Sequence, residues 1–511
     1  MNIEKQSRAY SIPNVIDLPT IEQPIATELL IPEYCPDIIK ILKCDVKNRV
    51  LAKRLKEHVL ELELCAEITI LYCGEDNVIS SVITKYNYSK TIENKSFINN
   101  SFNISVTNNN FNCRQTAARR VDVKGSVNIN ISINSFEAKE ILFNIDREDV
   151  EQLKCNYETT STIFTGEKQI IVEDELLLSS DKPDINYILR QNAMAIINEC
   201  KQIGEKAVIK GNIKVDVLYC SVSNSPANFS ETIPFSQIIE LNVKEKTCNV
   251  TSKASIMSFD IKPIMSTNSN AGFLVNVCLN ISLIGKCNIP VTIIKDCYST
   301  KINTDITQDK IHLNKLVETI NERIVIKKTV SLNDNHISSV ADLWCKEVSV
   351  DGIIENGDLK LSGLIECSML FCNVDNVPEH KDFKLDYEFS KKINDNSNLF
   401  VSNLEQRITS CSYTLISNNQ VEIQAEACVC AEIYEKHVCE CVCDVVENES
   451  VKDCDDSIII YYCENDESVW NIAKRFLTPL NTLKEQNNLT DEFVSSNSVL
   501  VITRMWGDIY E

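Results

Sequence analysis

The chain has 511 residues, with 73 acidic and 51 basic side chains and a formal net charge of -22. This negative charge argues against a nucleic-acid-binding protein and against binding to anionic membranes, because both need clustered lysine and arginine. Hydrophobic residues make up 44% of the chain and charged residues 24%. These fractions are typical of a folded protein, and the length predicts about three or four domains.

The N-terminal residues predict a protein that is not exported. Residues 1–8 are polar and no apolar segment follows them, so they do not resemble a signal peptide. No run of about 18 apolar residues predicts a membrane helix. In such a chain the 23 cysteines are expected to be reduced thiols that pack as small apolar residues.

The chain repeats itself at an interval of about 150 residues. The segment Pro36–Leu42 (PDIIKIL) recurs as Pro183–Leu189 (PDINYIL). A strand-like segment that contains Leu-Tyr-Cys or Leu-Phe-Cys occurs three times, at 71–73, 218–220 and 370–372. The third copy lacks the Pro-Asp-Ile motif, and the segment 338–344 is its candidate counterpart.

Each copy is predicted to be mostly β-structure. Each ends in a segment of alternating apolar and polar residues, at Val123–Ile133, Phe273–Leu283 and Val421–Ile433, which predicts strands with one buried face. Helices are expected only after the two Pro-Asp-Ile motifs, where proline suits a first helical turn, and at Lys315–Ile324. Glycine is scarce, so asparagine is expected to form many turns, including one at 108–110.

These copies resemble the SPOCS repeat of endospore-forming Firmicutes, through the Pro-Asp-Ile opening and the strand that ends in Tyr-Cys. The resemblance implies a structural family whose repeats bind coat proteins or one another. We predict SPOCS-like repeats at 1–150, 151–305 and 306–447, the last one degenerate. An acidic linker at 448–457 and a small βααβ domain at 458–504 are predicted to follow.

A group of cysteine and histidine residues lies near the end of the third copy: Cys428, Cys430, His437, Cys439, Cys441 and Cys443. Alternate residues of one strand lie about 6.6 Å apart, whereas zinc ligands must lie within about 4 Å of one another. A single strand therefore cannot bind zinc, and we predict no metal here. The favoured interpretation is an alternating buried face; a site shared with a second strand and oxidative cross-linking are the alternatives.

No enzyme motif is present. The chain has no nucleophile elbow, no phosphate-binding glycine loop and no pair of histidines at zinc-protease spacing. Its five histidines are scattered along the sequence. We therefore predict a protein without catalytic activity and without a cofactor.

The last 54 residues, 458–511, predict a strand, an amphipathic helix, a second helix and a closing strand. Val469, Ile472, Ala473 and Phe476 recur at helical spacing and share one face. Leu480, Leu483 and Leu489 of the second helix are predicted to cover this face. Asp466 or Ser468 is expected to cap the first helix.

This segment resembles the LysM module, a βααβ domain that binds N-acetylglucosamine polymers. Its turn-and-helix pattern occurs here as 465–476, with one residue inserted after the aspartate. The resemblance implies a groove, and the residues expected to line it are Asp466, Glu467, Ser468, Trp470, Asn487 and Asn488. Trp470 has two interpretations, as a core residue or as an anchor for a partner.

SPOCS repeats followed by one LysM module resemble a clostridial family of spore coat morphogenetic factors. The resemblance implies a scaffold at the forespore surface in the mother-cell cytoplasm, with its LysM module docked on a coat base-layer ATPase of the SpoIVA type. Residues 444–511 carry 14 acidic and 5 basic side chains, which favours a partner rich in lysine and arginine. The alternatives are a peptidoglycan-binding protein of the cortex or wall and a self-assembling coat subunit.

Overall fold

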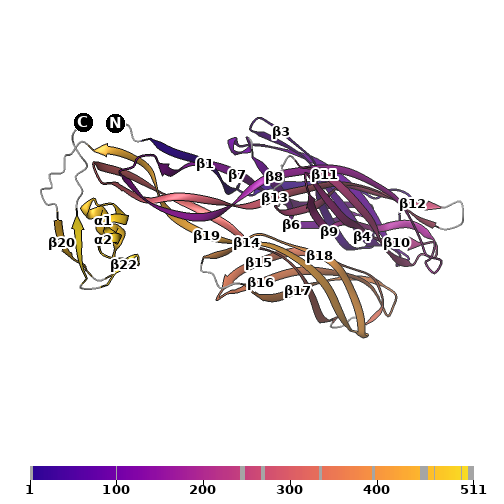
Figure 1. Cartoon of the computed structure of the whole chain (residues 1–511). Coiled ribbons are helices and arrows are strands. Elements are labelled where there is room, and N and C mark those ends of the chain that lie inside the picture. Colours follow the sequence, from indigo (N-terminus) through magenta and orange to yellow (C-terminus); the bar gives the residue numbers. More distant parts are fainter. Residues whose placement is uncertain are drawn as a thin grey trace.

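The structure is a computed structural model that describes residues 4–98, 100–241, 248–265, 271–332, 336–393, 398–448, 458–464, 466–495 and 498–503. Antiparallel strands form most of it, and the only α-helices in these ranges lie near the C-terminal end (Figure 1). The predicted mainly β fold is confirmed. None of the helices in the described ranges has the length and apolar character needed to cross a membrane.

Within the described ranges, nineteen strands precede the C-terminal module and fall into three groups. The first group is β1 (Lys5–Asp17), β2 (Ile21–Leu30), β3 (Lys40–Lys56), β4 (Val59–Cys73), β5 (Ile79–Glu93), the 3-10 helix η1 (Lys95–Phe97), β6 (Ser101–Ala117) and β7 (Arg120–Ile145). The second group is β8 (Val150–Leu177), β9 (Ile185–Ile203), β10 (Lys206–Ser221), β11 (Pro226–Glu240), β12 (Asn249–Met265) and β13 (Ala271–Ser299). The third group is β14 (Asn303–Ser331), β15 (Ile337–Glu355), β16 (Asp358–Asn373), β17 (Pro378–Lys392), β18 (Leu399–Ser417) and β19 (Gln420–Asn448).

Each group forms two antiparallel sheets that pack on each other. One sheet is a meander of three strands: β3-β4-β5, β9-β10-β11 or β15-β16-β17. In the other sheet the last strand of the group is central, so that β7 pairs with β6, β1 and β2, β13 with β12 and β8, and β19 with β18 and β14. The first group has two short strands, β1 and β2, at the place where the second group has the long strand β8 and the third has β14. Pro19 lies in the break, consistent with its inability to donate to a ladder.

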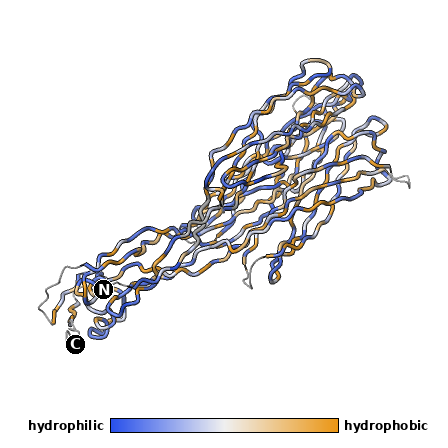
Figure 2. The backbone as a smooth tube through the Cα atoms, turned by 90° about the horizontal axis from the view of Figure 1, so that it is seen from above, coloured by the Kyte–Doolittle hydropathy of each residue, from blue (hydrophilic) through white to orange (hydrophobic). Residues whose placement is uncertain are grey.

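The predicted alternating strands are confirmed and form the centre of each core. Val127, Ile129, Ile131 and Ile133 of β7 are buried, and the polar residues between them are more exposed. The equivalent segments of β13 and β19 show the same alternation. It is visible as alternating colours along the strands in Figure 2. One face of each central strand therefore covers the meander of its own group.

The helices predicted after the Pro-Asp-Ile motifs are wrong. Pro36 and Pro183 lie in loops, and the residues that follow form β3 and β9. The segment Lys315–Ile324 lies inside β14. Proline fixes φ in a range that suits an extended segment as well as a first helical turn, and pairing with a neighbouring strand decides between the two.

The structure explains why the Pro-Asp-Ile motif and the Tyr-Cys motif occur together. The hydroxyl of Tyr72 donates to the carbonyl of Pro36 at 3.1 Å, and that of Tyr219 donates to the carbonyl of Pro183 at 2.9 Å. Both rings are buried within their own groups. The third group has Phe371 at this position, where no hydroxyl is available, and it also lacks the proline.

The leucine before each of these aromatic residues points to the opposite face of its strand and joins the groups to one another. Leu71, Leu218 and Leu370 are buried in one cluster with Leu42, Leu189 and Ala341. Leu42, Leu189 and Ala341 are each the extra residue of a β-bulge. Each bulge lies opposite the leucine and the aromatic residue of the neighbouring strand. Ala341 therefore corresponds to Leu42 and Leu189, the last residues of the two Pro-Asp-Ile segments, so the true counterpart ends three residues before the end of the predicted segment 338–344.

One pair of strands in each group continues beyond the paired sheets as a two-stranded arm: β1 with β7, β8 with β13, and β14 with β19. The arms lie side by side and form the narrow part of the molecule (Figures 1 and 2). Their shared core contains residues from all three groups: Tyr10, Ile141, Val291, Ile293, Ile311, Leu313, Cys439 and Cys441. We call this part the stalk.

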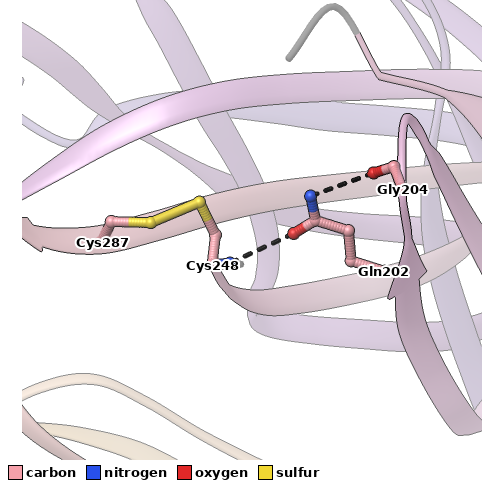
Figure 3. Close-up of a disulfide and its surroundings, with 4 residues drawn as sticks. All are labelled: Gln202, Gly204, Cys248 and Cys287. Atoms are coloured by element: carbon pink, nitrogen blue, oxygen red, sulfur yellow. Dashed lines mark hydrogen bonds between the residues drawn. A yellow bond between two sulfur atoms is a disulfide. The ribbon is translucent and has the colours of Figure 1, made fainter. Parts of the chain in front are cut away.

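Four cysteines depart from the prediction of reduced thiols. Cys44 of β3 is joined to Cys113 of β6, and Cys248 is joined to Cys287 of β13. Figure 3 shows the second pair, in which Gln202 accepts from the backbone N–H of Cys248 at 3.1 Å and donates to the carbonyl of Gly204 at 3.2 Å. Eighteen other described cysteines are free.

Asparagine forms many of the turns, as predicted, but not at 108–110. Asn224 and Asn376 have φ of 61° and 55° in turns between strands. Residues 108–110 lie inside β6, and the ladder with β7 shifts register between Asn109 and Asn112. Asn110 has φ of 43°, so asparagine tolerates positive φ here in a β-bulge rather than in a turn.

The tyrosine–proline bond can be tested by removing one oxygen atom. We expect Tyr219→Phe to destabilise the protein by about 1 kcal/mol, because the Pro183 carbonyl loses its partner while the ring keeps its packing. A lower midpoint of urea unfolding, followed by circular dichroism, measures this. Tyr462→Phe is the control, since that side chain is 71% exposed. Equal midpoints for both variants would contradict this role of the bond.

Candidate functional site: the C-terminal module

The C-terminal module contains two short helices and two small sheets. Its elements are β20 (Ile458–Tyr462), β21 (Glu467–Ser468), α1 (Val469–Phe476), α2 (Leu480–Gln486), β22 (Phe493–Val494) and β23 (Val499–Thr503). Strand β20 pairs with β23, and β21 pairs with β22. The predicted apolar face of α1 is buried against α2, so the predicted βααβ arrangement is confirmed.

Helix α1 begins without the predicted side-chain cap. Ser468 occupies the N-cap position, but its hydroxyl makes no capping hydrogen bond. Strand β21 ends at this residue and pairs with β22, which fixes the entry to the helix by backbone bonds instead. At the other end Leu477 adopts φ of 50°, a left-handed conformation that closes helices. Asn465, the first residue of the LysM-like pattern, lies outside the described residues.

The predicted groove residues have different environments. Asp466 and Asn488 are exposed and have φ of 53° and 52°. The Glu467 carboxylate accepts from the hydroxyl of Tyr461 at 2.8 Å and pairs with Arg475 at 2.9 Å. Asn487 donates to the carbonyl of Val501 at 2.8 Å and accepts from its N–H at 2.7 Å. Glu467 and Asn487 thus hold the module together, while Asp466 and Asn488 face solvent.

Trp470 contacts another part of the same chain. Its indole N–H donates to Asp296 Oδ2 at 2.8 Å, and Lys474 Nζ lies 2.6 Å from Asp296 Oδ1. The Tyr298 ring meets the indole edge to face, with centroids 5.1 Å apart. Trp470 is 7% exposed. Of its two predicted roles, the structure therefore shows the buried one, and in this arrangement the ring is not available to anchor an external partner.

Asp296 and Tyr298 lie in β13, at the end of one arm of the stalk. The Tyr298 hydroxyl donates to the carbonyl of Thr478 at 2.7 Å, and burial raises the pKa of this phenol. Leu153 of β8 packs against the same cluster. The module is thus seated on the second group of strands by a charged pair, an indole hydrogen bond and apolar contacts. The sequence analysis missed both β13 residues, because nothing in their local pattern marks a contact so distant in sequence.

The outer face of the β20–β23 sheet is apolar and exposed. Strand alternation buries Leu500 and Ile502 in the core and packs the half-buried Ile459 and Tyr461 against it. The opposite face has Ile458, Ile460, Tyr462, Val499 and Val501, with exposed fractions of 67, 62, 71, 50 and 43%. The register places Ile460 beside Val501 and Tyr462 beside Val499. We call these five residues the apolar strand face. Exposed apolar residues gathered in one patch are typical of interaction sites.

The cysteine and histidine group in β19 is divided between different environments. Cys439 and Cys441 are buried in the stalk, as predicted for an alternating face. The alternation ends there, because a register shift opposite Thr307 and Gln308 exposes Cys443 and buries Val442. A different set of three cysteines does come together in the described residues, in the third group: Cys345, Cys367 and Cys411.

Two parts of the chain match known family models. Residues 184–264, which cover β9 to β11 and most of β12, match the SipL, SPOCS domain family. Residues 464–503 match the LysM domain family. The chain contains a SipL-type SPOCS domain and a LysM domain. No curated protein and no solved structure matches the chain.

The two matches fix the broad character of the protein. SPOCS and LysM domains are structural or binding modules, and no catalytic domain was identified. The SipL-type domain associates the chain with sporulation and the spore coat. The LysM domain indicates a binding partner, either peptidoglycan or a protein.

The seat of the LysM domain can be tested at Asp296. We expect Asp296→Ala to weaken this contact by about 1–3 kcal/mol, because the Trp470 indole and the Lys474 ammonium lose their shared acceptor. Trp470 fluorescence should shift to longer wavelength, measured in a background where Trp344 and Trp506 are phenylalanine. Asp491→Ala is the control, since that carboxylate is exposed. An unchanged spectrum for Asp296→Ala would mean that the domain is held by other contacts.

Proposed function

We propose that this protein is a non-enzymatic scaffold of spore coat assembly and that its LysM domain docks a protein of the coat base layer. The proposed partner is an ATPase of the SpoIVA type. The site of action is the mother-cell cytoplasm at the forespore surface. The three groups of strands then provide surfaces for other coat proteins or for further copies of the chain.

The apolar strand face is the observation that carries this proposal. Glycan recognition by a LysM domain uses its groove, whereas this face lies on the outer side of the β20–β23 sheet. Aliphatic residues flanked by one exposed tyrosine suit a protein surface, because they gain free energy when both partners exclude water. An N-acetylglucosamine polymer offers mostly hydroxyl and amide groups to such a face.

Charge around the domain supports a basic protein partner. Glu464, Asp466, Asp491 and Glu492 are exposed. The two cations Lys474 and Arg475 of α1 are paired with Asp296 and Glu467. The domain therefore presents acidic groups, which attract lysine and arginine and repel an anionic wall polymer.

We also retain the repeat boundaries as a proposal: 1–150, 151–305 and 306–447, followed by an acidic linker and a LysM domain at 458–504. The family match falls within the second of these repeats. The linker at 448–457 lies almost wholly outside the described residues, so its predicted role rests on its acidic composition.

A second candidate function is binding of peptidoglycan or another N-acetylglucosamine polymer. Asp466 and Asn488 favour it, because both are predicted groove residues and both are exposed in turns with positive φ. Small polar groups and accessible backbone in such turns suit recognition of N-acetyl groups.

The docking proposal is tested with the full chain, because α1 of the LysM domain packs against β13. Ile460→Glu/Val501→Glu places charge at the centre of the apolar strand face and should weaken binding to the purified SpoIVA-type ATPase by at least about 30-fold, since such a central anchor contributes about 2 kcal/mol or more. Biolayer interferometry measures the binding. Melting temperature checks that the variant remains folded.

Asn488→Ala, in the predicted groove, is the matched control and should bind the ATPase as the unaltered chain does. The same proteins are tested against muropeptides and chitin oligomers. The docking proposal fails if the unaltered chain does not bind the ATPase and retains the glycans. Loss of this retention with Asn488→Ala would then assign glycan binding to the predicted groove.

A further inference from the structure

The three cysteines of the third group come from three strands. Cys345 of β15 and Cys367 of β16 are direct cross-strand partners, and Cys411 lies on β18 in the other sheet. Their three sulfur atoms lie within 4.8 Å of one another. Cys345 Sγ and Cys411 Sγ are 2.7 Å apart. This set joins the two sheets at the edge where β15 and β18 meet.

Hydrogen bonds between these strands hold the third sulfur opposite the other two. Gln406 of β18 donates to the carbonyl of Ser349 in β15 at 2.8 Å, and the Ile408 N–H donates to the Glu347 carboxylate at 2.9 Å. The Tyr387 hydroxyl donates to Gln406 at 2.7 Å. The spacing of β15 and β18 is therefore fixed by the protein rather than by a bond between sulfur atoms.

The other two groups show that the fold does not need sulfur at these positions. The three groups can be aligned at their bulge residues Leu42, Leu189 and Ala341. In this alignment Cys345 and Cys367 correspond to Val46 and Ile68 in the first group. They correspond to Ala193 and Val215 in the second group. These aliphatic residues contribute to the cores of their groups. The pair Cys345 and Cys367 is thus a special feature of the third group, which points to a chemical role.

The cluster also has access to solvent. Cys345 and Cys411 border an open cavity of about 350 Å³ between the second and third groups. Met194, Asn192 and Asp216 line the same cavity. Cys367 is 0% exposed and lies beneath the other two sulfurs. An ion could therefore enter from the cavity and find room there for a further ligand.

We propose that Cys345, Cys367 and Cys411 bind one zinc ion through three thiolates, with the fourth coordination position facing this cavity. Zinc takes cysteine sulfur at about 2.3 Å in tetrahedral geometry, which places sulfurs about 3.8 Å apart. The separations within 4.8 Å suit this arrangement after Cys345 and Cys411 move apart by about an ångström.

The full chain is first freed of metal and kept reduced with a phosphine under anaerobic conditions. It is then titrated with zinc in competition with a chromophoric chelator. We expect one equivalent of zinc to bind tightly, and the cobalt-substituted chain should show the absorption of tetrahedral cobalt thiolate. Cys345→Ser and Cys411→Ser should each lower the zinc affinity by more than about 100-fold, because even the loss of a residue that only supports a metal ligand lowers affinity by up to that factor.

Cys428→Ser/Cys430→Ser is the matched control, because these two neighbouring thiols of β19 both lie by Asn321 of β14, away from the three proposed ligands. This double variant should bind one zinc as tightly as the unaltered chain. Zinc should raise the melting temperature of the unaltered chain and the control, but not of the two single variants. It should also protect Cys345 and Cys411 from alkylation, read by mass spectrometry, which needs no variant.

Two outcomes overturn the proposal. One is tight zinc uptake that survives in Cys345→Ser and Cys411→Ser. The other is a Cys345–Cys411 disulfide recovered from the anaerobic preparation, together with no protection by zinc.

Discussion

Three long hairpins, one from each group of strands, bury their apolar faces against one another in the stalk. An isolated two-stranded hairpin is marginally stable in water. None of these arms has a second sheet of its own group to cover it at this end, so the contact between arms supplies the missing core. Burial of Tyr10, Val291 and Leu313 in one cluster shows that all three groups contribute. The full length of β8, β14 and β19 depends on this packing.

The same arrangement places the LysM domain. Asp296 and Tyr298 lie at the end of the second arm, where β13 has left the paired sheets. There they meet Trp470 and Lys474 of α1. A domain held in this way turns its helix toward the stalk and leaves the apolar strand face open to solvent. The stalk therefore determines which surface of the LysM domain is available for docking.

Polar contacts at the junctions of the groups add specificity to this apolar packing. Arg190 of the second group pairs with Asp342 of the third at 2.8 Å, with both side chains nearly buried, and the guanidinium lies 4.5 Å from the centroid of the Trp344 ring. Lys286 and Glu432 form a second buried pair at 2.6 Å. Buried ion pairs contribute little net stability, but losing one partner is costly. Such pairs favour one relative placement of the groups over others.

The sequence by itself determined the β-class, the three copies, the alternating central strands and the βααβ module, because each depends on local periodicity or on a repeated motif. Local pattern failed where tertiary pairing decides, as in the strands that follow Pro36 and Pro183 and in the bulge at 108–110. It also failed to reveal the role of Trp470, the two disulfides and the cluster of Cys345, Cys367 and Cys411. Those depend on residues that are distant in the chain and adjacent in space, and only the packing of sheets and arms brings them together.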